Sequence, residues 1–151
     1  MAKRNKYDSA IVALNLLVLW AGLSGIWNIC GGLQLHYGER ALGPTPGLST
    51  AVFMFALAVG FIVTSTYWSI AYIALASFAG VMATMNILHI TNGSSQSWMS
   101  TFWLYVAIVI NVSGVVGAVL AITHPFVGRV AKFLQWCVSI PIDHYRRGRA
   151  P

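Results

Sequence analysis

The sequence predicts an all-α polytopic membrane protein, with a bundle of four transmembrane helices and a C-terminal amphipathic helix at the membrane interface. Residues 41–128 contain no Asp, Glu, Lys or Arg, whereas a soluble domain of that length needs charged side chains to cover its surface. The chain has 151 residues, of which 58% are hydrophobic, and a mean hydropathy of +0.73. This size leaves no room for a separate soluble domain. We therefore expect a four-helix transmembrane domain over residues 1–124 and a cytoplasmic segment over residues 125–151.

The first predicted span covers about residues 9–35, which carry no charge. It is longer than the roughly 20 residues that cross a bilayer, so it should tilt or project above the outer surface. It is also too long for the apolar part of a signal peptide, and we interpret it as an uncleaved anchor. Residues 36–47 are rich in Gly and Pro and should form an outer loop.

The second and third predicted spans cover about residues 48–66 and 69–90. Few residues separate them, so they should form a tight hairpin in which Tyr67 and Trp68 anchor the chain at the interface. The polar stretch TNGSSQSWMS then predicts a second outer loop, and the fourth span covers about residues 101–123.

A short helix after Pro125 is predicted to lie along the membrane surface until Pro141 ends it. Apolar side chains recur at helical spacing on one face, while Arg129 and Lys132 lie opposite. The basic tail should bind anionic lipid headgroups. The predicted lipid or partner contacts in this region are Arg129, Lys132, Arg146 and Arg147.

The position of the basic residues predicts the orientation. Eight of the nine Lys and Arg flank the apolar region, within residues 3–6 and 129–149, and only Arg40 lies between. The positive-inside rule places both termini in the cytoplasm, in a plasma membrane or bacterial inner membrane. No polar segment interleaves aromatic and basic residues, so we expect no nucleic-acid partner.

Catalysis is not expected. The sequence contains no arrangement of nucleophile, base and acid at one depth, no metal-ligand spacing and no phosphate-binding loop. Without an ionisable Asp, Glu, Lys or Arg at membrane depth, ion-driven transport is also disfavoured. We predict a protein that is not an enzyme and has no cofactor or metal.

Each predicted span contains two small residues four positions apart, a spacing that lets helices approach closely. These pairs fit either packing inside the bundle or contact with another integral membrane subunit or lipid. The candidate contact residues are Gly25, Gly60, Gly80, Ser113 and Gly117.

Three hypotheses of function follow from the residues, and a fourth possibility fits the size and topology alone. The first is a non-catalytic accessory subunit that assembles or stabilises a larger membrane complex, such as a transporter or an electron-transfer assembly. The second is a small homo-oligomeric carrier or channel for an uncharged or lipidic solute, with its path lined by Asn15, Asn28, Asn86 and Asn111. An immunity or resistance protein of the cell envelope fits the size and topology as well.

The third hypothesis is a small haem-binding electron carrier. His36 and His89 lie at the outer ends of the first and third predicted spans, where they could ligate one haem. A second haem would need another pair near the inner ends, and only His124 lies there.

Residues 25–30, GIWNIC, resemble the G-L-W-x-x-C signature of the claudin and stargazin group through Gly25, Trp27 and Cys30. Members of that group have four spans and cytoplasmic ends. They also have a long first extracellular loop with strands and a second cysteine, whereas the loop here has about a dozen residues. The resemblance implies adhesion or an auxiliary role beside channels, and only the auxiliary role fits so small an outer surface.

Overall fold

The computed structural model describes residues 2–44, 47–92 and 98–123, and over these the chain forms α-helices without a strand. Each helix is long and apolar enough to cross a bilayer, so the predicted four-span helical fold is confirmed at that level. Apart from the start of α1, the ends of the helices agree with the predicted spans to within two residues. The helices are α1 (Ala2–His36), α2 (Leu48–Tyr67), α3 (Ser69–Asn92) and α4 (Thr101–Thr123).

The predicted interfacial helix and basic tail lie outside the described residues. The contacts predicted for Arg129, Lys132, Arg146 and Arg147 therefore remain predictions.

The first helix begins earlier than the predicted span. Its apolar part is Ser9–His36, but α1 starts at Ala2 and has 35 residues, which is about 52 Å at 1.5 Å per residue. Hydropathy marks only the part that suits lipid, whereas Ala, Lys and Arg before it are good helix formers. The helix therefore extends well beyond the roughly 30 Å of a hydrocarbon core.

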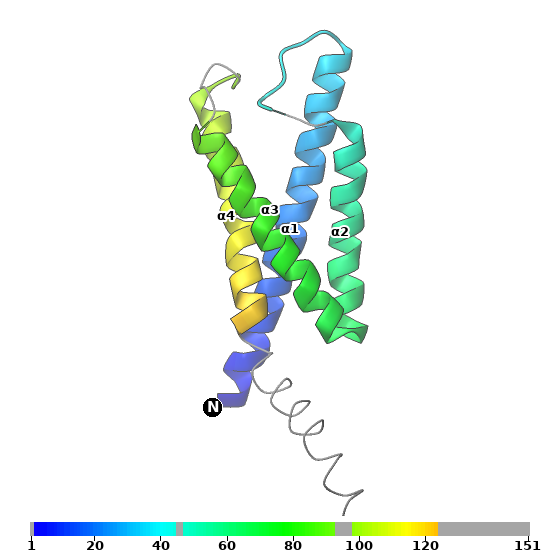
Figure 1. The fold of residues 1–151 in the computed structure, drawn as a ribbon, viewed down its shortest axis with the longest axis vertical. Helices are drawn as coiled ribbons and strands as arrows, with labels where there is room; N and C mark the ends of the chain where they lie inside the picture. The colour runs from blue at the N-terminus through cyan, green and yellow to red at the C-terminus, as the bar shows by residue number, and fades with distance from the viewer. Residues whose placement is uncertain (1, 45–46, 93–97, 124–151) are drawn as a thin grey trace, which may run out of the picture.

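The helices alternate in direction and do not pack equally (Figure 1). α1 packs closely on α2 and α4, and α3 packs closely on α4, whereas α2 and α3 have the weakest of these four contacts. α3 runs diagonally, next to α2 where Trp68 links them and next to α4 at its other end. We call the end with Trp68 the hairpin end, and the opposite end, with residues 37–44 and 98–100, the loop end.

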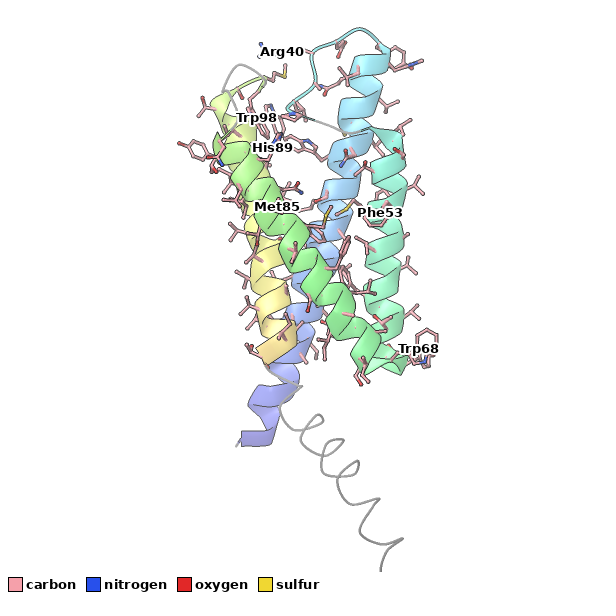
Figure 2. All side chains as sticks on the ribbon, viewed as in Figure 1. Arg40, Phe53, Trp68, Met85, His89 and Trp98 are labelled. Carbon is pink, nitrogen blue, oxygen red and sulfur yellow. The ribbon has the colours of Figure 1, made fainter. Side chains whose placement is uncertain are left out.

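The predicted hairpin between α2 and α3 is confirmed, with Trp68 as its one linking residue. The Trp68 side chain is 66% exposed and extends outward at the hairpin end (Figure 2). This position agrees with its predicted role as an interfacial anchor.

The core combines a few large side chains with many small ones. Leu17, Trp20 and Phe61 are fully buried. Buried alanines and close-packed glycines on α3 and α4 let these helices approach each other, so that a Cβ added at Gly80 would lie 2.9 Å from the Cβ of Ala118. In lipid, such close packing replaces the hydrophobic effect as the force that holds helices together.

We predict that Gly114→Ala destabilises the bundle and that Gly22→Ala does not. A Cβ at Gly114 would lie 2.7 Å from Cγ of the buried Trp20, whereas a Cβ at Gly22 meets nothing within 4 Å. Overpacking of this kind costs about 1–3 kcal/mol, while Ala in place of an unhindered helical Gly gains up to about 1 kcal/mol. SDS titration in mixed micelles measures both free energies of unfolding, and equal values for the two variants would contradict the packing described.

Candidate functional site

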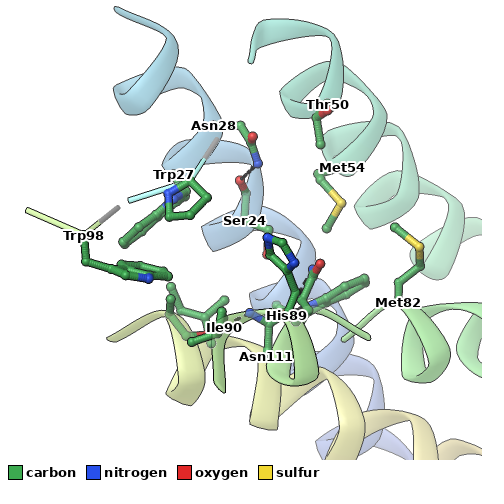
Figure 3. Close-up of a pocket in the computed structure, with 15 residues that line it drawn as sticks. Ser24, Trp27, Asn28, Thr50, Met54, Met82, His89, Ile90, Trp98 and Asn111 are labelled. Atoms are coloured by element: carbon green, nitrogen blue, oxygen red, sulfur yellow. Dashed lines mark hydrogen bonds between the residues drawn. The ribbon is translucent and has the colours of Figure 1, made fainter. Parts of the chain in front are cut away.

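A cavity of about 430 Å³ lies between the four helices in the half of the bundle nearer the loop end (Figure 3). Its volume is in the range of small-molecule sites, roughly 300–1,000 Å³. Among the described residues its lining includes no Asp, Glu, Lys or Arg, and His89 contributes the one imidazole of the lining.

The cavity exists because α2 and α3 separate toward the loop end. Nearer the hairpin end the two helices touch, since a Cβ added at Gly60 of α2 would lie 3.5 Å from Cδ1 of Leu75 on α3. Farther along, Met54 on α2 and Met82 on α3 line the cavity (Figure 3). A one-residue link fixes the helices together at one end only, so the space between them widens away from it.

A hydrogen-bonded carboxamide lies at the inner wall of the cavity. Asn111 is 7% exposed, and its Oδ1 accepts hydrogen bonds from Trp20 Nε1 and Asn86 Nδ2, both at 3.3 Å. Its Nδ2 donates to the carbonyl oxygen of Ala107 at 2.8 Å. The side chain thus joins α1, α3 and α4, and it satisfies polar groups that hydrocarbon cannot solvate.

Two further polar side chains of the lining keep unused hydrogen-bonding capacity. Asn86 is exposed, and beyond its bond to Asn111 its Oδ1 and second N–H have no partner in the described part of the chain. His89 is also exposed and lines the cavity, and its imidazole has no hydrogen bond to any described residue. Because an unsatisfied polar group in hydrocarbon is unfavourable, both side chains suit a bound polar group.

Aromatic and flexible apolar side chains form the rest of the wall. Trp27 packs against Trp98 at 6.0 Å and against Trp103 at 5.9 Å between ring centroids. Met54 and Met82 contribute unbranched thioether chains, which adapt to ligands of different shape. The cavity therefore offers an apolar volume with a few neutral hydrogen-bonding groups.

The loop after α1 covers the loop end of the cavity. Arg40 Nη2 donates to the carbonyl oxygen of Trp98 at 2.8 Å, and Met99 N donates to the carbonyl oxygen of Leu42 at 3.1 Å. The Trp98 ring is 6% exposed and packs directly on Gly43, where a Cβ would lie 2.5 Å from its Cε3. These contacts fasten the two loops to each other as a cover.

The structure brings together three of the four amides predicted to line a solute path. Asn28, Asn86 and Asn111 line the cavity, whereas Asn15 is exposed on α1 away from it. His89 lines the cavity and His36 does not; the His36 ring lies edge to face on Tyr37 at 5.4 Å. The two histidines of the haem hypothesis therefore do not share this cavity.

The small residues predicted as partner contacts lie close to this chain's own helices. At Gly25, Gly80 and Gly117 an added Cβ would approach a side chain of a neighbouring helix to 2.9–3.0 Å. Gly60 is half-buried and faces α3, and Ser113 is half-buried and donates to a backbone carbonyl of α4 at 2.7 Å. At these three close-packed glycines, the structure shows packing inside the bundle, which was one of the two interpretations of the small-residue pairs.

The sequence analysis missed the wall and cover residues of the cavity. Met54 and Met82 carry no signal, because a methionine in an apolar span is ordinary. Trp98 did carry one, because it is the single aromatic residue of the polar stretch TNGSSQSWMS. Arg40, the lone basic residue between the charged ends, was another.

Over the described residues, the chain is a bundle of four helices that are long and apolar enough to span a membrane, with a cavity between them whose lining carries no Asp, Glu, Lys or Arg. No family model matches the sequence, and neither the curated proteins nor the solved structures contain a match.

We predict that Trp20 and Asn111 are energetically coupled. Trp20→Phe and Asn111→Leu each remove their hydrogen bond, so the double variant should lose less stability than the two single losses added together. Interhelical hydrogen bonds in membranes contribute about 0.6 kcal/mol on average and about 1.7 at most. A double-mutant cycle in SDS unfolding measures the coupling, with Trp20→Phe and Asn15→Leu as the additive control pair; additivity in both cycles would show that the bond has no energetic role.

Proposed function

We propose that this protein binds and carries an uncharged lipidic solute in the cavity between its helices. The observation that carries the proposal is the gathering of Asn28, Asn86 and Asn111 around one cavity with an otherwise apolar lining. Asn86 and Asn111 are hydrogen-bonded to each other, and Asn86 keeps further hydrogen-bonding atoms that a ligand in the cavity can use.

The chemistry of the lining supports an uncharged ligand. A charged group at membrane depth needs a counter-ion, and the described lining offers none. Hydroxyl, carbonyl and amide groups can instead pair with the amides and with His89. The tryptophan, methionine and isoleucine walls favour an apolar remainder.

The closed core supports a carrier in preference to a channel. On the hairpin side of the cavity, Leu17, Trp20 and Phe61 are fully buried and fill the centre of the bundle. A solute would therefore cross only if the helices moved. α2 and α3 have the weakest contact of the neighbouring pairs, so a motion that separates these two helices breaks the least helix packing.

The basic ends of the chain support the orientation of the carrier. Under the positive-inside rule both termini face the cytoplasm, which places the loop end and its cavity on the outer side.

We predict that Asn86→Leu weakens ligand binding and that Asn15→Leu does not. Both asparagines are exposed residues of spans, but only Asn86 lines the cavity. Loss of one hydrogen bond, about 1 kcal/mol, weakens binding by about fivefold. Binding is measured by quenching of tryptophan fluorescence with a brominated long-chain alcohol in nanodiscs. Quenching that does not saturate, or that responds equally to both variants, would rule out the cavity as the binding site.

The position of Asn15 favours a second candidate function, the accessory subunit of a larger membrane complex. Asn15 is exposed on α1, six residues after Ser9, or about 9 Å along the helix. No described residue supplies its amide with a hydrogen-bond partner. A polar residue facing lipid is unfavourable, and an amide or hydroxyl on a neighbouring subunit would satisfy it.

If this second function holds, we expect Asn15→Leu to shift the native size of the detergent-extracted protein toward the monomer, or to remove co-purifying subunits. Asn86→Leu serves as the control and should leave the native size unchanged. The two variants thus give opposite results in the binding and size measurements. A monomer without partners in the unaltered protein would contradict the accessory role and leave the carrier proposal standing.

A further inference from the structure

We propose that the ligand is a single-chain amphiphile with a neutral hydroxyl or amide head, which enters the cavity sideways from the bilayer between α2 and α3, head first. This inference rests on the proposed function and adds the ligand class, the route and the orientation.

The route follows from which sides of the cavity are closed. Toward the hairpin end the fully buried core fills the bundle. Toward the loop end, Trp98 and Gly43 are in direct contact and the Arg40 side chain is hydrogen-bonded across them. α1 packs closely on both α2 and α4, and α3 on α4, which leaves the weakly packed side between α2 and α3, where the partly exposed rings of Phe53 and Phe78 meet edge to face with 6.3 Å between their centroids. Figure 1 shows these two helices separating toward the loop end.

The orientation follows from where the polar groups lie. Asn111 is ten residues into α4, or about 15 Å from its start at the loop end, and it lies at the inner wall beside Trp20. Met54 and Met82 lie where α2 and α3 separate (Figure 3). When the head of such a ligand reaches the amides, the alkyl chain of the ligand lies between the two flexible methionines. The methyl end of that alkyl chain then lies in the hydrocarbon of the bilayer.

The class of head group follows from the unused atoms of Asn86. Its free Oδ1 requires a donor and its free N–H requires an acceptor. A hydroxyl or an amide provides both in one group, and neither needs a counter-ion. The depth of about 15 Å places the head near the middle of the membrane, since a hydrocarbon core is about 30 Å thick.

The orientation is tested with brominated octadecanols as quenchers of tryptophan fluorescence in nanodiscs. One probe carries bromine next to the hydroxyl and the other carries it near the methyl end. We expect the first to quench Trp20 more strongly, measured as the difference between the protein and its Trp20→Phe variant. If that variant does not fold, the two probes are compared in a Trp68→Phe background, which removes the quenching of the exposed tryptophan at the hairpin end from the signal.

The route is tested by joining α2 to α3 with a bifunctional thiol reagent. Cysteines replace Met54 and Met82 in a background that carries Cys30→Ser and Cys137→Ser, and the rate of quenching is followed after mixing with probe-loaded vesicles. The control joins Gly60→Cys to Leu75→Cys, where α2 and α3 already lie close because an added Cβ at Gly60 is 3.5 Å from Leu75. We expect the first link to abolish rapid quenching and the control link to leave it unchanged.

The outcomes separate the inference from the proposed function. Saturable binding with stronger quenching by the methyl-end bromine would overturn the head-first orientation, and unchanged quenching after the first link would overturn the route. Equal affinity for an octadecyl carboxylate or trimethylammonium probe would overturn the neutral head. Absence of saturable binding by every probe would overturn the proposed function itself.

Discussion

The Asn111 carboxamide is the interaction on which the arrangement of the bundle depends. One oxygen accepts hydrogen bonds from Trp20 on α1 and Asn86 on α3, so three of the four helices meet at a single group. In water such a group would exchange partners freely, but in hydrocarbon each lost bond leaves a polar atom unsatisfied. The network therefore sets how α1, α3 and α4 approach one another, and Gly114 lies against Trp20 to permit it.

The second helix takes no part in this network, and that difference explains the cavity. α2 is held by α1, where the Phe55 ring covers Gly25, and by Trp68, which links it to α3. Meanwhile α3 is drawn to α4 by contacts such as Gly80 with Ala118. A helix fixed to α2 at one end and to α4 at the other must run diagonally. The space left between α2 and α3 forms the cavity, and the side chains that line it include amides.

The sequence predicts the number of helices and their ends well, because both depend on local properties. A long run without charge, broken by Gly and Pro or by a polar stretch, defines each span independently of its neighbours. The cavity depends on crossing angles, which a sequence of nearly uniform hydropathy does not encode. In a soluble helix the apolar face identifies the buried side, but in lipid every face is apolar. The asparagines indicated polar groups of the lining, but their spacing along the chain could not show that Asn15 faces away while Asn86 lines the cavity.

The lack of formal charge also defines the character of this cavity. A ligand cavity in a soluble protein commonly adds a few polar or charged groups to apolar walls, and water competes for each hydrogen bond. Here residues 41–128 supply no Asp, Glu, Lys or Arg, so a charged ligand would remain unpaired while a neutral one would lose little on leaving the bilayer. Discrimination between ligands would then depend on a single neutral head group. The amides of the cavity can hydrogen-bond to a hydroxyl or amide, whereas the hydrocarbon of the bilayer cannot. Under the proposed function, the described bundle of four helices would in this way select one lipidic molecule from the many around it.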